Sequence, residues 1–195
     1  MSPPLPPADF QSRKLQIVSI AVRSEMHRFY TSTFEPVYFD RSDLGRFNAP
    51  DGSYGVLYTA KKIEGAFAET FLRTPGNTLI DIGFLKRKAY VRLSATRDLR
   101  MVNLTGQGLA VAGATAEVPH SGLPYRAPQA WSRAIFDHGE NVDGIAYHAR
   151  HDDTEVCYAI FDRAGLALSE TARELHLDAD WFWRIAEEYG SGLSP

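Results

Sequence analysis

The sequence predicts an α+β fold, and three observations support this class. Short apolar segments typical of strands and amphipathic segments typical of helices follow one another irregularly, without the regular strand–helix repeat of a parallel sheet. The chain has 195 residues, of which 44% are hydrophobic and 23% charged, which is enough for one domain with its own core. It contains neither Gly-x-Gly-x-x-Gly nor Gly-x4-Gly-Lys-Ser/Thr, so neither Rossmann-type nor P-loop enzymes are indicated.

The expected elements can be placed along the chain in order. Strands are expected at 27–30, 56–59, 78–82, 89–93, 99–104, 144–147 and 156–161, and a strand or short helix at 15–22. Helices are expected from Lys61, over 128–138, and twice in the tail, where 171–174 has the capping-box pattern and Asp180 can cap 181–189. Residues 40–52 form a turn-rich loop, and 105–123 are expected to form a mobile loop with a short helix.

The helix that begins at Lys61 is amphipathic, and we expect it to end before Pro75-Gly76. Its apolar stripe consists of Ile63, Ala66, Phe67, Thr70 and Phe71, which share one face at helical spacing. At 100° per residue, Glu69 lies roughly 130° away from this stripe. We therefore expect the Glu69 side chain to be free of the core.

Composition narrows the functional classes. The net charge of −3 disfavours non-specific nucleic-acid binding. No segment has the ~20 apolar residues that a membrane span needs, and the proline-rich 1–7 segment does not resemble a secretory signal; we expect it to be a solvated tail. Cys157 is the only cysteine, which fits a reducing, cytoplasmic compartment, and its apolar surroundings predict a small buried filler rather than a nucleophile.

Three side chains suggest a ligand site. Arg46 lies in a loop of glycine, asparagine and proline, Tyr58 ends a short apolar strand, and Glu69 follows on the predicted helix. An arginine offers forked donors to phosphate, a tyrosine offers a flat face for stacking, and a glutamate offers negative charge where a cation develops on a ribose. This set suits an anionic, aromatic, sugar-bearing ligand such as a dinucleotide.

These residues stand within motifs that resemble the RES domain, a family named for an arginine, a glutamate and a serine. The motifs are HRFY (27–30), GRFNAPDG (45–52), GVLYTA (55–60), AFAETF (66–71) and APQAWSRAIFDHGENVDGIAYHARHDDTEVCYAIF (127–161). The resemblance divides the chain into an N-terminal extension (1–23), a RES domain (24–168) and a C-terminal helical extension (169–195).

The resemblance implies an ADP-ribosyltransferase-like fold, with small mixed sheets and helices around a cleft for NAD. It also implies a bacterial toxin that is held in check by an Xre-type antitoxin with a helix-turn-helix. The activities it implies are cleavage of the nicotinamide–ribose bond of NAD, by hydrolysis or phosphorolysis, and transfer of ADP-ribose to a protein target. NAD is then the substrate. From the residues themselves we expect no metal, because no second cluster with metal-ligand spacing appears in the sequence.

Four residues match the family pattern. The resemblance implies that Glu69 and Arg46 are catalytic, that Arg28 and Arg46 hold the pyrophosphate, and that Tyr58 stacks on nicotinamide or ribose. The serine is missing, because the Tyr-x-Ser-Arg segment of the family reads Tyr147-His148-Ala149-Arg150 here. The departure leaves several alternatives open: a variant site, a weakened enzyme, another hydroxyl that takes over, such as Thr154, or a catalytically weakened cleft kept for binding NAD or a partner.

Structural interpretations of the same residues stay open at this stage. Glu69 could form an i, i+4 ion pair with Arg73, and Arg46 could cap backbone carbonyls of its loop. Arg28 could be a surface charge paired with Glu25 or Asp40. Tyr58 could pack at the end of its strand. The His/Asp-rich segment 148–153 is interpreted as a polar hairpin loop rather than a metal site. The aromatic helix 181–189 is interpreted as core packing, with self-association into a homodimer or antitoxin docking as the alternative.

Overall fold

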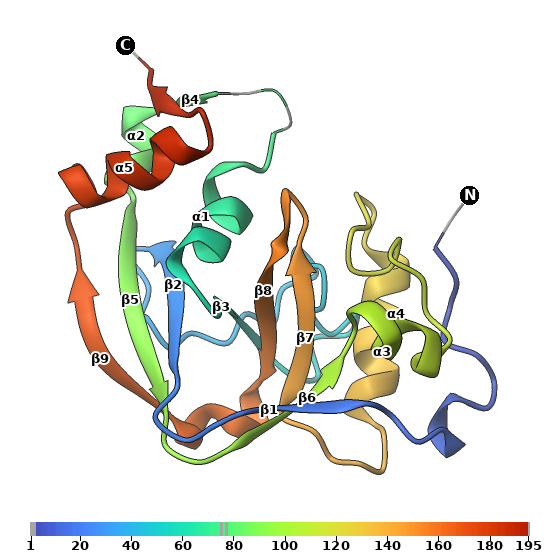
Figure 1. Ribbon diagram of the computed structural model, residues 1–195. Coiled ribbons are helices and arrows are strands. Elements are labelled where there is room, and N and C mark those ends of the chain that lie inside the picture. The colour runs from blue at the N-terminus through green and yellow to red at the C-terminus, as the bar shows by residue number, and fades with distance from the viewer. Residues whose placement is uncertain (1–2, 75, 77, 195) are drawn as a thin grey trace.

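The computed structural model describes residues 3–74, 76 and 78–194, and shows a strongly curved sheet with helices above it and beside it (Figure 1). Its strands are β1 Ile17–Ile20, β2 Glu25–Thr31, β3 Val56–Ala60, β4 Leu79–Ile80, β5 Lys88–Ala95, β6 Leu99–Asn103, β7 Gly144–Ala149, β8 Asp152–Phe161, β9 Leu168–Glu174 and β10 Gly192–Leu193. Its α-helices are α1 Ile63–Phe71, α2 Ile82–Lys86, α3 Gly106–Ala112, α4 Arg126–Phe136 and α5 Asp180–Glu188, with 3-10 turns at Phe10–Ser12 and Asp162–Ala167.

The α+β class is confirmed, although most strands join one large sheet. Within the described residues, eight strands pair in the order β1-β6-β7-β8-β3-β2-β5-β9, while β10 and β4 form a separate parallel pair. Only β6 and β7 are parallel neighbours in the large sheet. No described helix is long and apolar enough to cross a membrane.

The large sheet curls because two long chain segments, β1–β2 and β5–β6, run side by side and bend sharply at the same place. β1 runs almost directly into β2, and β5 into β6, while β1 pairs with β6 and β2 with β5. At the corner Arg23 adopts a positive φ of 66°, and its N–H donates to Ala95 O at 2.8 Å. The two segments therefore serve both halves of the sheet and close them around an interior.

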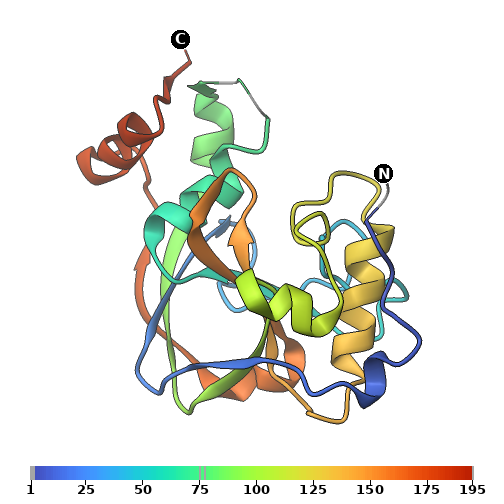
Figure 2. The same cartoon turned by 45° about the vertical axis from the view of Figure 1, so that its right-hand side comes forward.

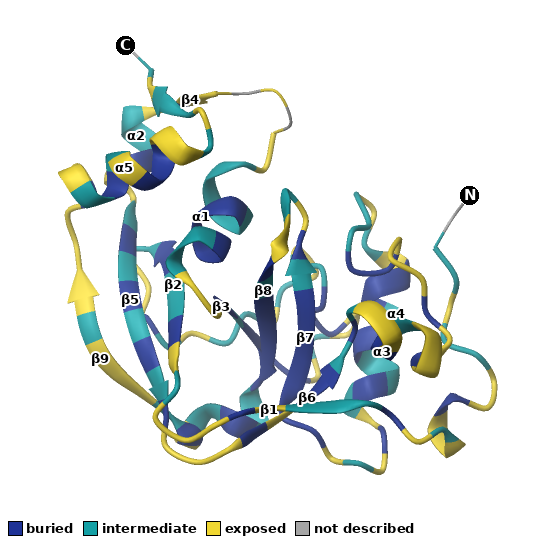
Figure 3. Ribbon diagram, viewed as in Figure 1, coloured by how far each residue is buried: buried dark blue, intermediate teal, exposed yellow. Residues whose placement is uncertain are grey.

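Two apolar cores result from this curvature (Figure 3). In the inner core, every second residue of β5 is buried, in the alternation expected of a strand with one apolar face; these residues are Ala89, Val91, Leu93 and Ala95. The outer core lies under the helices and contains Phe67 of α1, Trp131 of α4 and Phe182 of α5. The burial of Phe182, Ile185 and Ala186 confirms that the aromatic C-terminal helix packs into the core.

Two local predictions are wrong. Residues 171–174, expected as a helix from their capping-box pattern, belong to strand β9, which pairs antiparallel with β5. Tertiary pairing thus overrides a local helix signal. The expected strand 78–82 shrinks to two residues because α2 begins at Ile82, where the Asp81 side chain caps Phe84 N–H. Helix α1 already ends at Phe71, before the Pro75-Gly76 pair that was expected to end it. Pro75 lies outside the described residues.

The proline-rich segment is not a solvated tail over its described part, which begins at residue 3. It runs along α4 (Figure 2), where Trp131 Nε1 donates to Pro4 O at 2.7 Å. The buried Phe10 ring then meets the Trp131 ring edge-on, with centroids 5.2 Å apart. A buried indole needs a hydrogen-bond acceptor, and the Pro4 carbonyl supplies it.

A buried carboxylate fixes the corner of the sheet to β7. Asp143, which is 6% exposed, accepts two hydrogen bonds from the Arg97 guanidinium at 2.7 and 2.8 Å and one from Arg100 N–H at 2.8 Å. Burial alone would raise the pKa of Asp143, but these hydrogen bonds outweigh it and lower the pKa below its ordinary value. The ionised form therefore stabilises the fold.

Replacing Asp143 by asparagine should lower the free energy of unfolding near neutral pH by about 1–3 kcal/mol, because charged hydrogen bonds in a buried site are lost. Since folding lowers the pKa of Asp143, its contribution is present above the unfolded value of 3.8 and is lost as the pH falls through the folded value. Urea unfolding of both proteins, at neutral pH and at about pH 3, measures the difference, which should shrink in acid.

Glu170→Gln is the matched control, because Glu170 also receives two hydrogen bonds from one arginine, Arg173, but at the surface. An exposed pair of this kind contributes less than about 1 kcal/mol. Equal losses in the two variants would contradict the role given to the buried Asp143.

Candidate functional site

The sheet opens between β2 and β3. These strands share one register pair, His27 with Ala60, whereas β2 pairs with β5 along its whole length and β3 does so with β8. Next to His27, Arg28 fills the opening, and its Nη1 donates to Tyr58 O at 2.9 Å. A carbonyl left without a strand partner is thereby satisfied.

A cleft of about 550 Å³ lies over this opening, a size typical of small-molecule sites. Among the described residues, five cationic and two acidic side chains line it, although the whole chain carries a net charge of −3. The cations are Arg28, Arg46, Arg73, Lys88 and Arg150, and the acids are Asp40 and Glu69. Phe29, Tyr30, Phe34, Tyr38, Tyr58, Phe84, Tyr125 and Tyr147 add aromatic surface. The lining suits an anionic ligand with flat rings.

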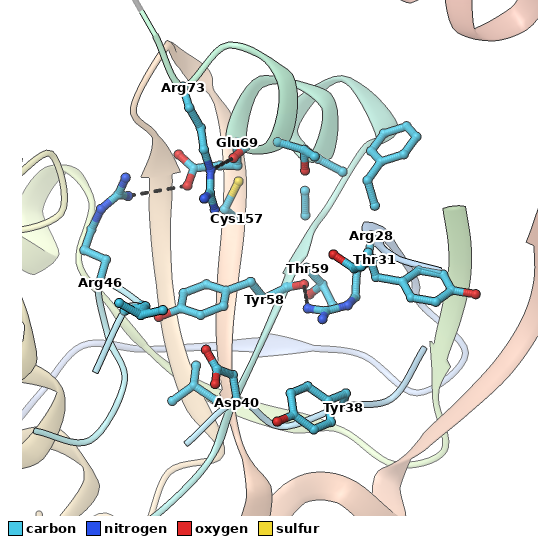
Figure 4. Close-up of a pocket in the computed structure, with 18 of the residues that line it drawn as sticks. Arg28, Thr31, Tyr38, Asp40, Arg46, Tyr58, Thr59, Glu69, Arg73 and Cys157 are labelled. Carbon is cyan, nitrogen blue, oxygen red and sulfur yellow. Dashed lines mark hydrogen bonds and ion pairs between the residues drawn. The ribbon is translucent and has the colours of Figure 1, made fainter. Parts of the chain in front are cut away.

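Glu69 projects from α1 into the cleft, as its position off the apolar stripe predicts (Figure 4). One carboxylate oxygen, Oε1, accepts the backbone N–H of Arg150 at 2.7 Å, and the other, Oε2, lies 3.6 Å from Arg46 Nη1. Arg73 does not pair with this carboxylate, since its Nε donates to the backbone oxygen of Glu69. The local ion pair that spacing allowed is therefore not formed.

Arg46 faces Glu69 from the loop between β2 and β3, and its side chain is only 9% exposed. Within the described part of the chain, its Nε and Nη1 are buried without a hydrogen-bond partner, so these groups do not cap carbonyls. Burial would lower the pKa of Arg46, but the nearby Glu69 carboxylate raises it above its ordinary value. A buried guanidinium with unsatisfied donors is costly unless an anion completes its hydrogen bonds.

Tyr58 anchors the loop that carries Arg46. Its hydroxyl accepts Phe47 N–H at 2.8 Å and donates to Asn48 Oδ1 at 2.9 Å. Gly45 is required here, because a Cβ at this position would lie 2.2 Å from Asn48 Oδ1. Tyr58 therefore does more than pack at the end of a strand: its hydroxyl is committed to the loop, while its ring lines the cleft.

Arg28 lies on the far side of the Tyr58 ring from Arg46 (Figure 4). Arg28 is half-buried rather than exposed, and burial lowers its pKa to about 10, with Asp40 the strongest opposing influence. Glu25 pairs instead with Arg92 at 3.4 Å. Arg28 Nε has no hydrogen-bond partner among the described residues. The cleft thus presents incompletely satisfied guanidinium groups on both sides of one aromatic ring.

The structure also shows what surrounds the missing serine. Ala149 ends β7 and is fully buried, and Arg150, the next residue, supplies the N–H that binds Glu69. Thr154 does not replace the serine, because its hydroxyl bonds Asp152 at 2.6 Å and it is not among the residues that line the cleft. The segment 148–153 closes the β7–β8 hairpin, with its turn at Arg150 and His151. No group of acids, histidines or cysteines in the described residues could hold a metal.

Cys157 lies beneath Glu69 (Figure 4). It is buried, and burial together with the Glu69 carboxylate raises the pKa of its thiol well above the ordinary value. A protonated thiol is a poor nucleophile. Its burial confirms the prediction of a small buried residue at this position.

Two contributors to the site were not predicted from the sequence. The backbone N–H of Arg150 has no sequence signal, since every residue other than proline carries one. Tyr147, whose ring lies 5.7 Å from the Arg46 guanidinium carbon, stands in the segment compared with Tyr-x-Ser-Arg, but no role was predicted for its ring. Its contact depends on the loop that carries Arg46.

Comparisons with known proteins agree with this geometry. The family model of the RES domain matches residues 20–181, and no curated protein matches the chain. Among solved structures, the chain is similar to the toxin in the crystal structure of the MbcT–MbcA toxin–antitoxin complex of M. tuberculosis. The two chains are 14% identical with a TM-score of 0.68, over 87% of this chain and 92% of that one.

The structural likeness, at this low identity, establishes the shared fold. The match to the family model covers most of the chain, including β2, the Arg46 loop, α1 and the β7–β8 hairpin that together build the cleft. This chain belongs to the RES-domain family.

Proposed function

We propose that this protein is a cytoplasmic toxin that consumes NAD by cleaving its nicotinamide–ribose bond. The observation that carries the proposal is the pairing of Glu69 with the buried, incompletely satisfied Arg46 in a cationic and aromatic cleft. Membership of the RES-domain family and the likeness to a toxin from a toxin–antitoxin complex support it.

In the proposed reaction, the electron pair of the glycosidic bond leaves with nicotinamide, and positive charge develops on the ribose. Glu69 stabilises that charge from a fixed position, because Arg150 N–H holds one of its oxygens. Arg46 and Arg28 contact the pyrophosphate from the two sides of Tyr58, whose ring offers a stacking face. A preorganised charge at such a site contributes about 3–4 kcal/mol to the transition state.

The contacts of Glu69 favour an enzyme over a weakened binding module. A serine hydroxyl would orient a ribose or the glutamate, but here a backbone donor already orients the glutamate. Alanine at position 149 is therefore compatible with catalysis by Glu69. The catalytic assignment of Glu69 and Arg46 rests on this arrangement.

The positive charge of the cleft favours one acceptor of ADP-ribose over another. Lys88 and Arg73 add to the two arginines assigned to the pyrophosphate, so more positive charge is present than one dinucleotide neutralises. This excess favours inorganic phosphate over water as the acceptor of ADP-ribose. If ADP-ribose is instead transferred to a protein target, incubation with labelled NAD should leave the label on that protein.

We infer that an antitoxin protein of the Xre type, with a helix-turn-helix, restrains this activity in the cell. The structurally similar toxin was crystallised with its antitoxin, which supports an antitoxin as the partner. Coexpression of the adjacent gene product with this chain, followed by copurification, tests the inference.

Replacing Glu69 by glutamine should reduce NAD loss by about 100-fold or more, because the side chain keeps its shape but loses the charge that stabilises the ribose cation. NAD loss by the purified protein, with and without phosphate, is the measurement. Glu64→Gln, on the same helix but outside the cleft lining, is the control and should retain full activity. Normal turnover by Glu69→Gln would remove the assignment.

Replacing Tyr58 by phenylalanine should raise the KM for NAD by about tenfold and lower stability by about 1–3 kcal/mol, because buried Phe47 N–H loses its acceptor and the Arg46 loop loosens. Steady-state kinetics and urea unfolding measure the two effects. Tyr54→Phe is the control: it removes another buried hydroxyl bond near this loop, to Ser132 at 2.8 Å, away from the cleft. An unchanged KM in Tyr58→Phe would contradict the anchoring role.

A further inference from the structure

Tyr189, at the C-terminal end of α5, joins two elements that are far apart in sequence. Its hydroxyl donates to Asp152 Oδ2 at 2.7 Å, at the start of β8. Its ring stacks on Phe67 of α1, with centroids 5.4 Å apart and ring planes inclined by 12°. One side chain thus contacts both the β7–β8 hairpin and α1.

Both of these elements hold Glu69. Helix α1 carries Glu69 two residues after Phe67, about half a turn further along. In the hairpin, Arg150 and His151 form the turn between β7 and β8, and Arg150 N–H is the donor to Glu69 Oε1. Asp152 follows this turn directly. The contacts of Tyr189 therefore link the helix that carries the carboxylate to the hairpin that carries its backbone donor.

The hydroxyl of Tyr189 has no substitute at this position. The other oxygen of the Asp152 carboxylate, Oδ1, accepts Thr154 N–H at 3.0 Å and the Thr154 hydroxyl at 2.6 Å. These bonds are local to β8 and do not connect the hairpin to another element. Among the described residues, Tyr189 supplies the only hydrogen bond to Asp152 Oδ2.

We propose that Tyr189 is a positioning residue that holds the β7–β8 turn against α1, so that Arg150 N–H keeps Glu69 oriented in the cleft. The inference rests on the function proposed for Glu69. Tyr189 lies beyond residue 181, where the match to the RES family model ends. The C-terminal helix would therefore complete the site from outside the matched region.

The test compares Tyr189→Phe with the unchanged protein. The substitution keeps the ring that stacks on Phe67 and removes only the hydroxyl. We expect kcat for NAD loss to fall about tenfold with KM nearly unchanged, since small misplacements of a catalytic group lower rates strongly. Hydrogen exchange at the Arg150 amide should accelerate about tenfold, because its bond to Glu69 is made less often.

Two further variants separate positioning from general loss of stability. Trp183→Phe removes a hydrogen bond of the same helix, from Trp183 Nε1 to Asp178 Oδ1 at 2.8 Å, that does not reach the hairpin; it should change neither kcat nor Arg150 exchange. Asp152→Ala removes the acceptor of Tyr189 and should lower kcat similarly. The double variant of Tyr189→Phe with Asp152→Ala should then be no slower than Asp152→Ala alone.

The outcomes are distinguishable from failure of the proposed function. If the unchanged protein does not consume NAD, the proposed function fails, but exchange at the Arg150 amide still tests the contact. Accelerated exchange in Tyr189→Phe but not in Trp183→Phe supports the positioning role. Unchanged exchange and kcat in Tyr189→Phe, or equal losses in Trp183→Phe, would overturn it.

Discussion

The ion pair between Arg46 and Glu69 is the interaction on which the rest of the cleft depends. Burying a guanidinium beside a carboxylate is costly, and at 3.6 Å the two groups do not satisfy each other fully. The arrangement persists because the surrounding structure holds each partner independently: Tyr58 fixes the loop of Arg46, and Arg150 N–H fixes Glu69. Both residues line the cleft, where a ligand can add to their hydrogen bonds.

The curled sheet provides a stabilising core that offsets the free-energy cost of such a site. The inner core is built from alternating residues of the corner strands and their neighbours, and among its buried members that the structure describes only Tyr30 also lines the cleft. The sheet can then open between β2 and β3, where Arg28 satisfies an otherwise unpaired carbonyl. Positive charge is thus concentrated in the opening of an otherwise acidic chain. We regard this separation of stabilising core from binding cleft as the main architectural feature of the protein.

Sequence reasoning predicted the features that depend on local pattern. Strands with alternating or continuous apolar residues were found near their expected places, and the angular position of Glu69 on α1 correctly predicted that it avoids the core. Long-range contacts were not predictable in this way. The pairing of Arg46 with Glu69, the backbone donor of Arg150 and the packing of Pro4 on Trp131 all depend on tertiary placement, as does β9, whose local pattern favours a helix.

The most direct test of the account is a crystal structure of the Glu69→Gln protein soaked with NAD, in which binding is retained and turnover is suppressed. The account predicts that the nicotinamide-bearing ribose lies beside position 69 and that phosphate oxygens accept hydrogen bonds from Arg46. NAD bound elsewhere, or a folded protein whose cleft stays empty at saturating NAD, would contradict it.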